Sequence, residues 1–319
     1  MNVWIVSSYR YGIGTDYFMY EDISIFSSSA TSIKSIMDRF ELEPGWAALN
    51  WITAKIFNDP KVIFAISSFI FLFCAYKMIA YYVDRISVGM SIFILLILCY
   101  LPSFNAVRQY VAIGILMLSF KYIENKRLIK FFILVFIATI FHYTALVFIP
   151  IYFILYKKIS KTKIAVIIGG AFTIILGYNF IISTIISISP AFEKYERYLY
   201  TGNGQFNMIM FLFQAIIVSF ILLAYNPLKN SNYFMYNLVY VFFISIVVSF
   251  LGNMVLFVGR ISYYFEISLI ILIPYICKNI VRAKDKPIIY TIIIILFILY
   301  WYITFIYSGN HQCVPYISI

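Results

Sequence analysis

IIYTIIIILFILYWYITFIY, residues 288–307, has no charged side chain at any of its twenty positions. At about 1.5 Å per residue, a helix of this length crosses the roughly 30 Å hydrocarbon core of a bilayer. The whole chain repeats this character, because 63% of its 319 residues are hydrophobic and only 12% are charged. One soluble core could not bury so much apolar surface. The sequence therefore predicts an all-α, polytopic helical membrane protein.

Apolar runs of this kind predict about eight full spans. They cover residues 62–83, 87–102, 106–120, 164–183, 206–225, 235–256, 262–280 and 288–307.

The apolar stretch 129–156 is not predicted to be a single membrane span. As one helix it would be about 40 Å long, which exceeds the bilayer core. Basic residues flank it on both sides, and the positive-inside rule places both flanks in the cytoplasm. These flanking residues are Lys121, Lys126, Arg127 and Lys130 before the stretch and Lys157, Lys158, Lys161 and Lys163 after it. We therefore predict a short helical hairpin that turns near His142.

The same topology explains the net charge of +11. Basic residues such as Arg85, Lys229 and Lys278 fall in the inner loops, where the positive-inside rule expects them. The charge thus reflects orientation in the membrane, and no nucleic-acid partner is expected. The segments that then lie outside are the first 60 residues, the turn before Arg108, the hairpin tip at His142, the loop 184–205, the start of the helix at Arg260 and the tail with His311. Every candidate functional residue is therefore on one face.

The N-terminal segment is acidic and contains no span of its own. Its apolar residues recur at helical spacing over 33–40 and again after Pro44, which predicts two amphipathic helices on the outer leaflet, anchored by Trp46 and Trp51. The alternative is a peripheral plug that packs against the bundle and has no chemical role. MNVWIVSSYR has no basic region or long apolar core typical of a cleavable signal peptide. Either a further transmembrane helix precedes this segment or the first long helix carries it across the membrane.

Five motifs point to a family. They are RYGIGTDY at 10–17, EPGW at 43–46, NAVRQYVA at 105–112, FHYTALVFIP at 141–150 and RISYYFEISLIILIP at 260–274. In order and predicted depth they resemble the EpsG-like branch of the Wzy polysaccharide polymerases over nearly the whole chain. The most specific part is an Arg-Gln pair followed about 33 residues later by Phe-His-Tyr.

This resemblance implies a bacterial inner-membrane enzyme. It would join polyprenyl-pyrophosphate-linked oligosaccharide repeat units on the periplasmic face, in O-antigen, capsule or exopolysaccharide synthesis. Expected partners are the lipid-linked substrates, the bilayer, and a flippase and a chain-length regulator of the same pathway. The predicted topology divides the chain into a periplasmic or interfacial segment (1–61), the transmembrane bundle (62–308) and a periplasmic tail (309–319).

Arginines are the expected ligands of the departing pyrophosphate. The guanidinium group binds phosphate oxygens bidentately and stays charged near lipid. Arg108, with its polar neighbour Gln109, and Arg260 are the first candidates, and Arg10 is the third. A purely structural role is the alternative, because Arg108 could snorkel to headgroups and Arg260 could form an ion pair with another span.

The attacking hydroxyl needs a base that works near neutral pH, which an imidazole provides. His142 is the first candidate, and the carboxylates of Asp16 and Glu43 are alternatives. Tyr17 could stack on a sugar, as could Tyr20. The structural alternatives are a histidine that caps the hairpin and an aspartate that makes the Gly-Ile-Gly-Thr turn. No cofactor and no metal are expected, because a pyrophosphate bound by arginine is already a good leaving group.

Two other classes of protein fit part of the pattern. A flippase or transporter would line a central path with charges from both sides and would usually contain repeated halves, which this sequence lacks. A membrane acyltransferase that modifies the glycan would need a histidine deep in the membrane with a polar partner, and His142 could be that residue.

Overall fold

The computed structural model describes residues 2–57, 59–160, 208–253 and 258–317, with isolated positions between 161 and 207. Every regular element in the described ranges is a helix, which confirms the all-α class. The predicted span 164–183 and the loop 184–205 lie outside the continuously described ranges.

Four helical stretches are long and apolar enough to cross a membrane. They are α5 (Val62–Tyr81), α16 (Tyr233–Gly252), the stretch Val258–Asn279, and the stretch Ala283–Tyr307. A fifth span results if α14 (Met208–Leu223) is counted with α15 (Tyr225–Ser231), from which it is bent by 62°. Length and composition therefore support a membrane protein with four or five such helices among the described residues, and the predicted count of eight spans is not confirmed.

The chain breaks between the predicted spans 87–102 and 106–120, as their bounds imply, and the first of the two is shorter than a full span. Residues 88–100 form α6 (Val88–Leu95) and the π-helix η1 (Leu96–Tyr100), which together reach only about 20 Å. Pro102 then starts the single turn α7 (Pro102–Asn105), and Ala106 leaves helical geometry at φ −88°, ψ 53°. The next helices are α8 (Val107–Met117) and α9 (Ser119–Glu124).

The stretch 129–156 reverses direction. α10 (Leu128–Phe141) ends at His142, whose backbone is extended, and the 3₁₀-helix η2 (Tyr143–Phe148) leads into α11 (Ile149–Leu155). Phe131 near the start of α10 contacts Tyr152 in α11, with ring centroids 5.2 Å apart. The two arms therefore lie antiparallel.

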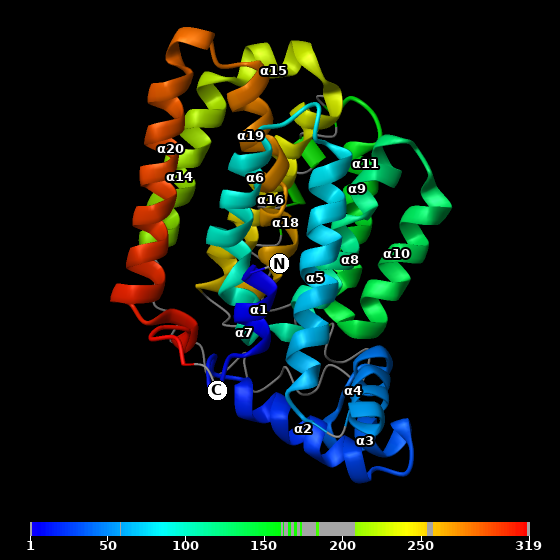
Figure 1. The fold of residues 1–319 in the computed structure, drawn as a ribbon. Helices are drawn as coiled ribbons and strands as arrows, with labels where there is room; N and C mark the ends of the chain where they lie inside the picture. The colour runs from blue at the N-terminus through cyan, green and yellow to red at the C-terminus, as the bar shows by residue number, and fades with distance from the viewer. Residues whose placement is uncertain are drawn as a thin grey trace.

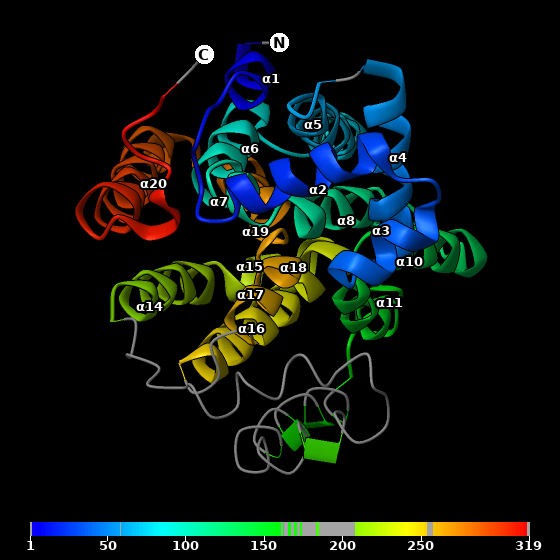
Figure 2. The same ribbon diagram turned by 90° about the horizontal axis from the view of Figure 1, so that it is seen from below.

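Most of the N-terminal segment forms a helical layer across one end of the bundle (Figures 1 and 2). The two predicted helices are present as α3 (Ile33–Phe40) and α4 (Pro44–Phe57), and two more, α1 (Asn2–Ser8) and α2 (Tyr17–Ser29), were not predicted. Helix α1 lies beside α5, where Trp4 Nε1 donates to the Ala65 carbonyl at 2.8 Å. The predicted role of Trp46 as a headgroup anchor is wrong, because its side chain is fully buried under α2.

The C-terminal tail joins the same end. Tyr11 N donates to Ile317 O at 3.0 Å, and Gly14 N donates to Gln312 O at 3.2 Å. We call the end formed by α2, α3, α4 and residues 309–317 the capped end. At the opposite end lie α15 and the turn from α19 (Leu269–Asn279) into α20 (Lys286–Trp301) (Figure 1). We call it the basic end, because these elements and the segments that contact them contain Arg85, Lys121, Lys229, Lys278, Arg282 and Lys284.

The remaining elements connect these parts. They are α17 (Val258–Ile261), α18 (Tyr263–Glu266), η4 (Ala283–Asp285), η5 (Tyr302–Tyr307) and η6 (Asn310–Gln312).

Candidate functional site

The break between α7 and α8 is the centre of the polar contacts at the capped end. Asn105, the last residue of α7, accepts hydrogen bonds at Oδ1 from Thr15 Oγ1 at 2.6 Å and from Asp16 N at 2.9 Å. Its Nδ2 lies 3.1 Å from His311 Nδ1 in the tail. One amide side chain thus joins the N-terminal segment, the bundle and the tail.

Three predicted site residues meet on the other side of this break. Arg108 Nη1 donates to Glu43 Oε2 at 2.5 Å, and His142 Nδ1 lies 3.1 Å from Glu43 Oε1. The Glu43 side chain is only 1% exposed, whereas 20% of Arg108 and 17% of His142 remain exposed. A buried carboxylate therefore holds a guanidinium and an imidazole that both retain an accessible edge.

Gly45 allows Glu43 to lie beside His142. Glu43 directly precedes α4, and Gly45 in its first turn packs against the end of α10. A Cβ at Gly45 would lie 2.8 Å from the Ile140 carbonyl oxygen, closer than real Cβ contacts allow. Because only glycine fits there, the EPGW motif can bring Glu43 to His142 at the C-terminal end of α10.

Charge and hydrogen bonds keep Glu43 ionised. Burial alone would raise the pKa of its carboxyl, but the hydrogen bond from His142 and the positive charge of Arg108 outweigh burial and lower the pKa to about 2. A carboxylate that accepts from Nδ1–H fixes the imidazole tautomer with the lone pair on Nε2. His142 is thereby prepared to accept a proton at Nε2.

Tyr20 adds a hydroxyl to this group. Its side chain is buried on α2, packs edge-to-face on Trp46 with ring centroids 5.5 Å apart, and lies near Arg108. Burial raises the pKa of Tyr20, so its hydroxyl stays protonated. The sequence suggested that Tyr20 could stack on a sugar, but its ring is enclosed by protein and lies beside Arg108.

Arg260 lies beside the same break. Its guanidinium Nη1 is 3.7 Å from Asp16 Oδ2, and its backbone carbonyl accepts from Gln109 Nε2 at 2.7 Å. The acidic residue in the following turn, Glu266, accepts a hydrogen bond from Ser262 Oγ at 2.8 Å. Arg108 and Gln109 are consecutive, so α8 links the Glu43 group to the Asp16–Arg260 pair.

The Gly-Ile-Gly-Thr turn sets the position of Asp16. Gly12 and Gly14 have φ of 62° and 95°, which disfavour side chains. A Cβ at Gly14 would lie 3.0 Å from the Phe104 carbonyl oxygen. The turn therefore lies directly on α7, where Thr15 and Asp16 reach Asn105.

Two predicted residues do not join this group. Arg10 is 1% exposed and sits between the rings of Phe64 and Phe104, whose centroids are 4.7 and 4.4 Å from its Cζ. Its guanidinium nitrogens have no hydrogen-bond partner within the described part of the chain, and burial lowers the pKa of Arg10 to about 10. Tyr17 is also buried and stacks on Phe64 at 4.5 Å.

His311 was not among the predicted site residues. Its Nε2 lies 3.5 Å from the Tyr263 hydroxyl, opposite the contact to Asn105. Burial, reinforced by the charge of Arg260, lowers the pKa of His311 to about 4, so it is neutral near pH 7. As one of only two histidines in the chain, it could have been noticed, but nothing in its neighbouring sequence indicated a contact.

The described ranges contain no group of three or more His, Cys, Asp or Glu side chains that could hold a metal ion. The polar groups at the α7–α8 break offer two guanidinium groups for an anion and one oriented imidazole for proton transfer.

Comparison with known proteins agrees with the motifs. The model of the EpsG family matches residues 1–318. The chain belongs to the EpsG family. Membership in this bacterial, membrane-associated family of Wzy-like polymerases suggests a polysaccharide polymerase-like function. No curated protein and no solved structure matches the chain.

Proposed function

We propose that this EpsG-family protein is a Wzy-type polymerase of the bacterial inner membrane. It joins polyprenyl-pyrophosphate-linked oligosaccharide repeat units on the periplasmic face, in O-antigen, capsule or exopolysaccharide synthesis. The observation that carries the proposal is the buried Glu43 carboxylate, which binds both Arg108 and His142 and leaves each with an accessible edge. A flippase and a chain-length regulator of the same pathway would be its partners.

In the proposed reaction an acceptor hydroxyl attacks the anomeric carbon of the donor glycan. The new glycosidic bond forms as the bond from that carbon to the pyrophosphate oxygen breaks, and the electron pair leaves with the lipid pyrophosphate. His142 Nε2 takes the hydroxyl proton. The positive charges of Arg108 and Arg260 stabilise the charge that develops on the leaving group.

The other residues position these groups. Glu43 holds His142 in the tautomer that can accept a proton. We therefore assign Glu43 this positioning role, and not the role of the base that the sequence also allowed. Asp16 and Gln109 orient Arg260 through its side chain and its backbone carbonyl. Arg10 and Tyr17 support the wall formed by α5 and α7 without contacting substrate. No metal is expected to take part, and polymerisation that disappears with EDTA and returns with magnesium would contradict this.

The test is a glycan ladder from cells that lack the protein and from cells complemented with His142→Ala at the normal protein level. Loss of a polymerase should leave single repeat units on the carrier, and His142→Ala should lower polymer formation by roughly 10²–10⁴-fold. Absence of any external glycan would instead indicate a flippase, and full-length unacylated polymer would indicate an acyltransferase. Labelling of cysteines introduced at positions 108 and 142 from the cytoplasmic side would contradict the proposed periplasmic site.

A further inference from the structure

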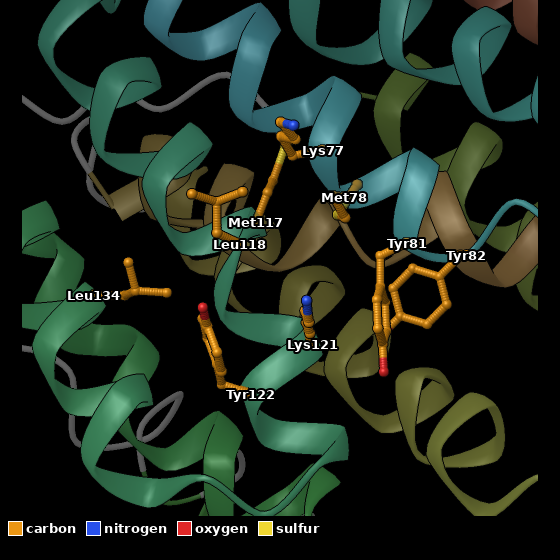
Figure 3. Close-up of a pocket in the computed structure, with 9 residues that line it drawn as sticks. All are labelled: Lys77, Met78, Tyr81, Tyr82, Met117, Leu118, Lys121, Tyr122 and Leu134. Carbon is orange, nitrogen blue, oxygen red and sulfur yellow. The ribbon is translucent and has the colours of Figure 1, made fainter.

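A pocket of about 360 Å³ opens at the basic end (Figure 3). One side of the pocket comes from the C-terminal half of α5 and the other side from α10. The floor comes from the end of α8 and from α9. Its residues take no part in the group around Glu43. The pocket combines an apolar wall with a basic rim, and these two parts call for a ligand with matching chemistry.

The wall is formed by flexible apolar side chains: Met78 from α5, Met117 and Leu118 at the end of α8, and Leu134 from α10. Methionine and leucine side chains adapt to irregular apolar ligands, and methionine is common at surfaces that accept varied apolar groups. A small hydrophilic anion would leave this wall unused.

The rim is basic. Lys77 and Lys121 line it together with the hydroxyl-bearing rings of Tyr81 and Tyr122, and Lys121 lies between these two rings in the view of Figure 3. Lys121 Nζ is 5.4 Å from the centroid of the Tyr81 ring. Cation–π contacts of this kind leave the N–H donors of the ammonium group for a ligand.

No carboxylate in the described ranges forms an ion pair with either lysine of the rim. The acid in α9, Glu124, is already bound by two nitrogens of Arg85, at 2.5 and 3.1 Å. The two positive charges of Lys77 and Lys121 therefore stay unneutralised by the protein, which favours an anionic ligand.

The surroundings of the pocket are suited to lipid. Helix α5 exposes Phe73 and Tyr76 beside it, and α10 exposes Ile129, Ile133 and Phe136. Apolar side chains exposed on membrane helices contact acyl chains, so a lipid molecule can enter the pocket sideways from the bilayer. The positive-inside rule puts this end of the bundle in the cytoplasmic leaflet, where basic pockets between helices bind lipid headgroups.

We propose that this pocket binds one anionic phospholipid of the cytoplasmic leaflet. The lipid phosphate lies at Lys77 and Lys121, and part of an acyl chain lies along Met78, Met117 and Leu134. This site is independent of the polymerase reaction proposed above.

The experiment measures lipid bound to the purified full chain by native mass spectrometry, with phosphatidylglycerol and phosphatidylcholine as the two probes. The wild type should retain phosphatidylglycerol in preference to phosphatidylcholine. The double variant Lys77→Gln/Lys121→Gln should bind phosphatidylglycerol roughly 30-fold more weakly, about fivefold for each lysine removed. The matched control, Lys229→Gln/Lys284→Gln, removes the same charge at the same end and should bind like the wild type.

A third variant tests the apolar wall. Leu134→Trp keeps both lysines and fills the space for the acyl chain, so it should also weaken phosphatidylglycerol binding while the protein stays folded, as judged by its melting temperature. Equal retention of the two lipids, or an equal loss in the two double variants, would overturn the proposal. So would displacement by inorganic phosphate at the same concentration as phosphatidylglycerol, or unchanged affinity of Leu134→Trp, because both outcomes would mean that the lipid chain contributes nothing.

Discussion

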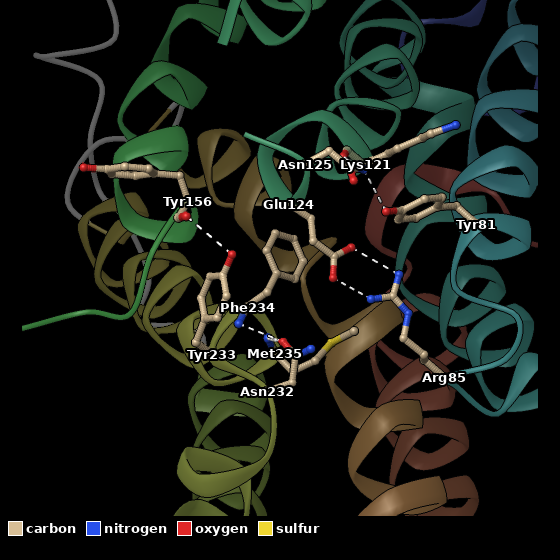
Figure 4. A network of polar contacts seen from close by, with 10 residues as sticks. All are labelled: Tyr81, Arg85, Lys121, Glu124, Asn125, Tyr156, Asn232, Tyr233, Phe234 and Met235. Carbon is tan, nitrogen blue, oxygen red and sulfur yellow. Dashed lines mark hydrogen bonds and ion pairs between the residues drawn. The ribbon is translucent and has the colours of Figure 1, made fainter. Parts of the chain in front are cut away.

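Two arginine–carboxylate pairs lie at opposite ends of the bundle, with the same 2.5 Å bond and different surroundings. At the basic end, Arg85 makes two bonds to Glu124, and the Arg85 side chain is 33% exposed (Figure 4). At the capped end, Arg108 makes one bond to Glu43, which is almost fully buried and also binds His142.

The contacts around the pair at the basic end are structural. Asn125 Nδ2 donates to the Tyr81 hydroxyl at 2.9 Å, and the Asn232 side chain caps α16 by accepting from Phe234 N at 2.9 Å (Figure 4). These hydrogen bonds stabilise loops and helix ends. Bond length therefore gives no reason to assign different roles to the two arginines, and the proposed role of Arg108 rests on the buried carboxylate that it shares with a partly exposed imidazole.

The largest expected difference between the two pairs is in polymer formation after each arginine is removed. Arg108→Ala should lower polymer formation by roughly 10²–10³-fold, because it removes a preorganised charge from the leaving group. Arg85→Ala is the matched control and should leave the glycan ladder unchanged. The measurement is the ladder at equal protein levels, and equal loss in the two variants would mean that the Arg108 pair is structural as well.

A smaller effect is expected when only the charge of each carboxylate is removed. Glu43→Gln keeps the size of the side chain and loses the orientation of His142, so activity should fall by at least the roughly 10–100-fold that is typical when the carboxylate partner of a metal-binding histidine is removed. Glu124→Gln should leave polymer length and amount as in the wild type. Full activity in Glu43→Gln would show that His142 needs no carboxylate partner.

The third prediction concerns the close approach that brings Glu43 to His142. Gly45→Ala should destabilise the protein by about 1–3 kcal/mol and shorten the glycan ladder, because the new Cβ must push α4 away from α10. Gly89→Ala in α6 is the control, since a Cβ there meets no atom within 4 Å. It should be neutral or stabilise by about 0.4–1 kcal/mol. Thermal unfolding in detergent gives both values, and indistinguishable melting temperatures would contradict the packing account.

The last prediction concerns a pH dependence of stability at the capped end, with no effect on activity expected near pH 7. The pKa of His311 is about 4 in the folded protein, against 6.5 for the free side chain. The unfolded chain therefore binds the proton first as the pH falls, so this contribution to stability is complete above pH 6.5, decreases down to pH 4 and is constant below it. His311→Gln should remove this part of the dependence, as measured by melting temperature between pH 7 and pH 4. An unchanged pH dependence in the variant would show that His311 is not held neutral.

The helical class and part of the N-terminal segment could be predicted because they depend on local patterns. Apolar length predicted membrane helices, and the spacing of Ile33, Ile36 and Phe40 predicted α3. The predicted number of spans is not confirmed, because apolar length alone does not decide it. Residues 87–120 were predicted as two spans, and Pro102 and the non-helical Ala106 do divide them, but the first part, Val88–Tyr100, is shorter than a full span.

The candidate site could be predicted only as a set of residues. His142, Arg108 and Glu43 were each noted for their chemistry, but the sequence contains no information that pairs Glu43 with Arg108, 65 positions away, or with His142, 99 positions away. Arg10 has the same chemistry as Arg108 and also lies in one of the five motifs. The difference is that Arg10 is enclosed by two aromatic rings, which no local pattern reveals.

By itself the sequence determined that this chain is a helical membrane protein of the EpsG family, because apolar length and short motifs are properties of neighbouring residues. Only the tertiary structure decided which carboxylate holds the imidazole, which arginine is buried, and that His311 of the tail meets Asn105. Each of these depends on how closely distant segments can approach, and at Gly45 and Gly14 that approach is set by the absence of a single carbon atom.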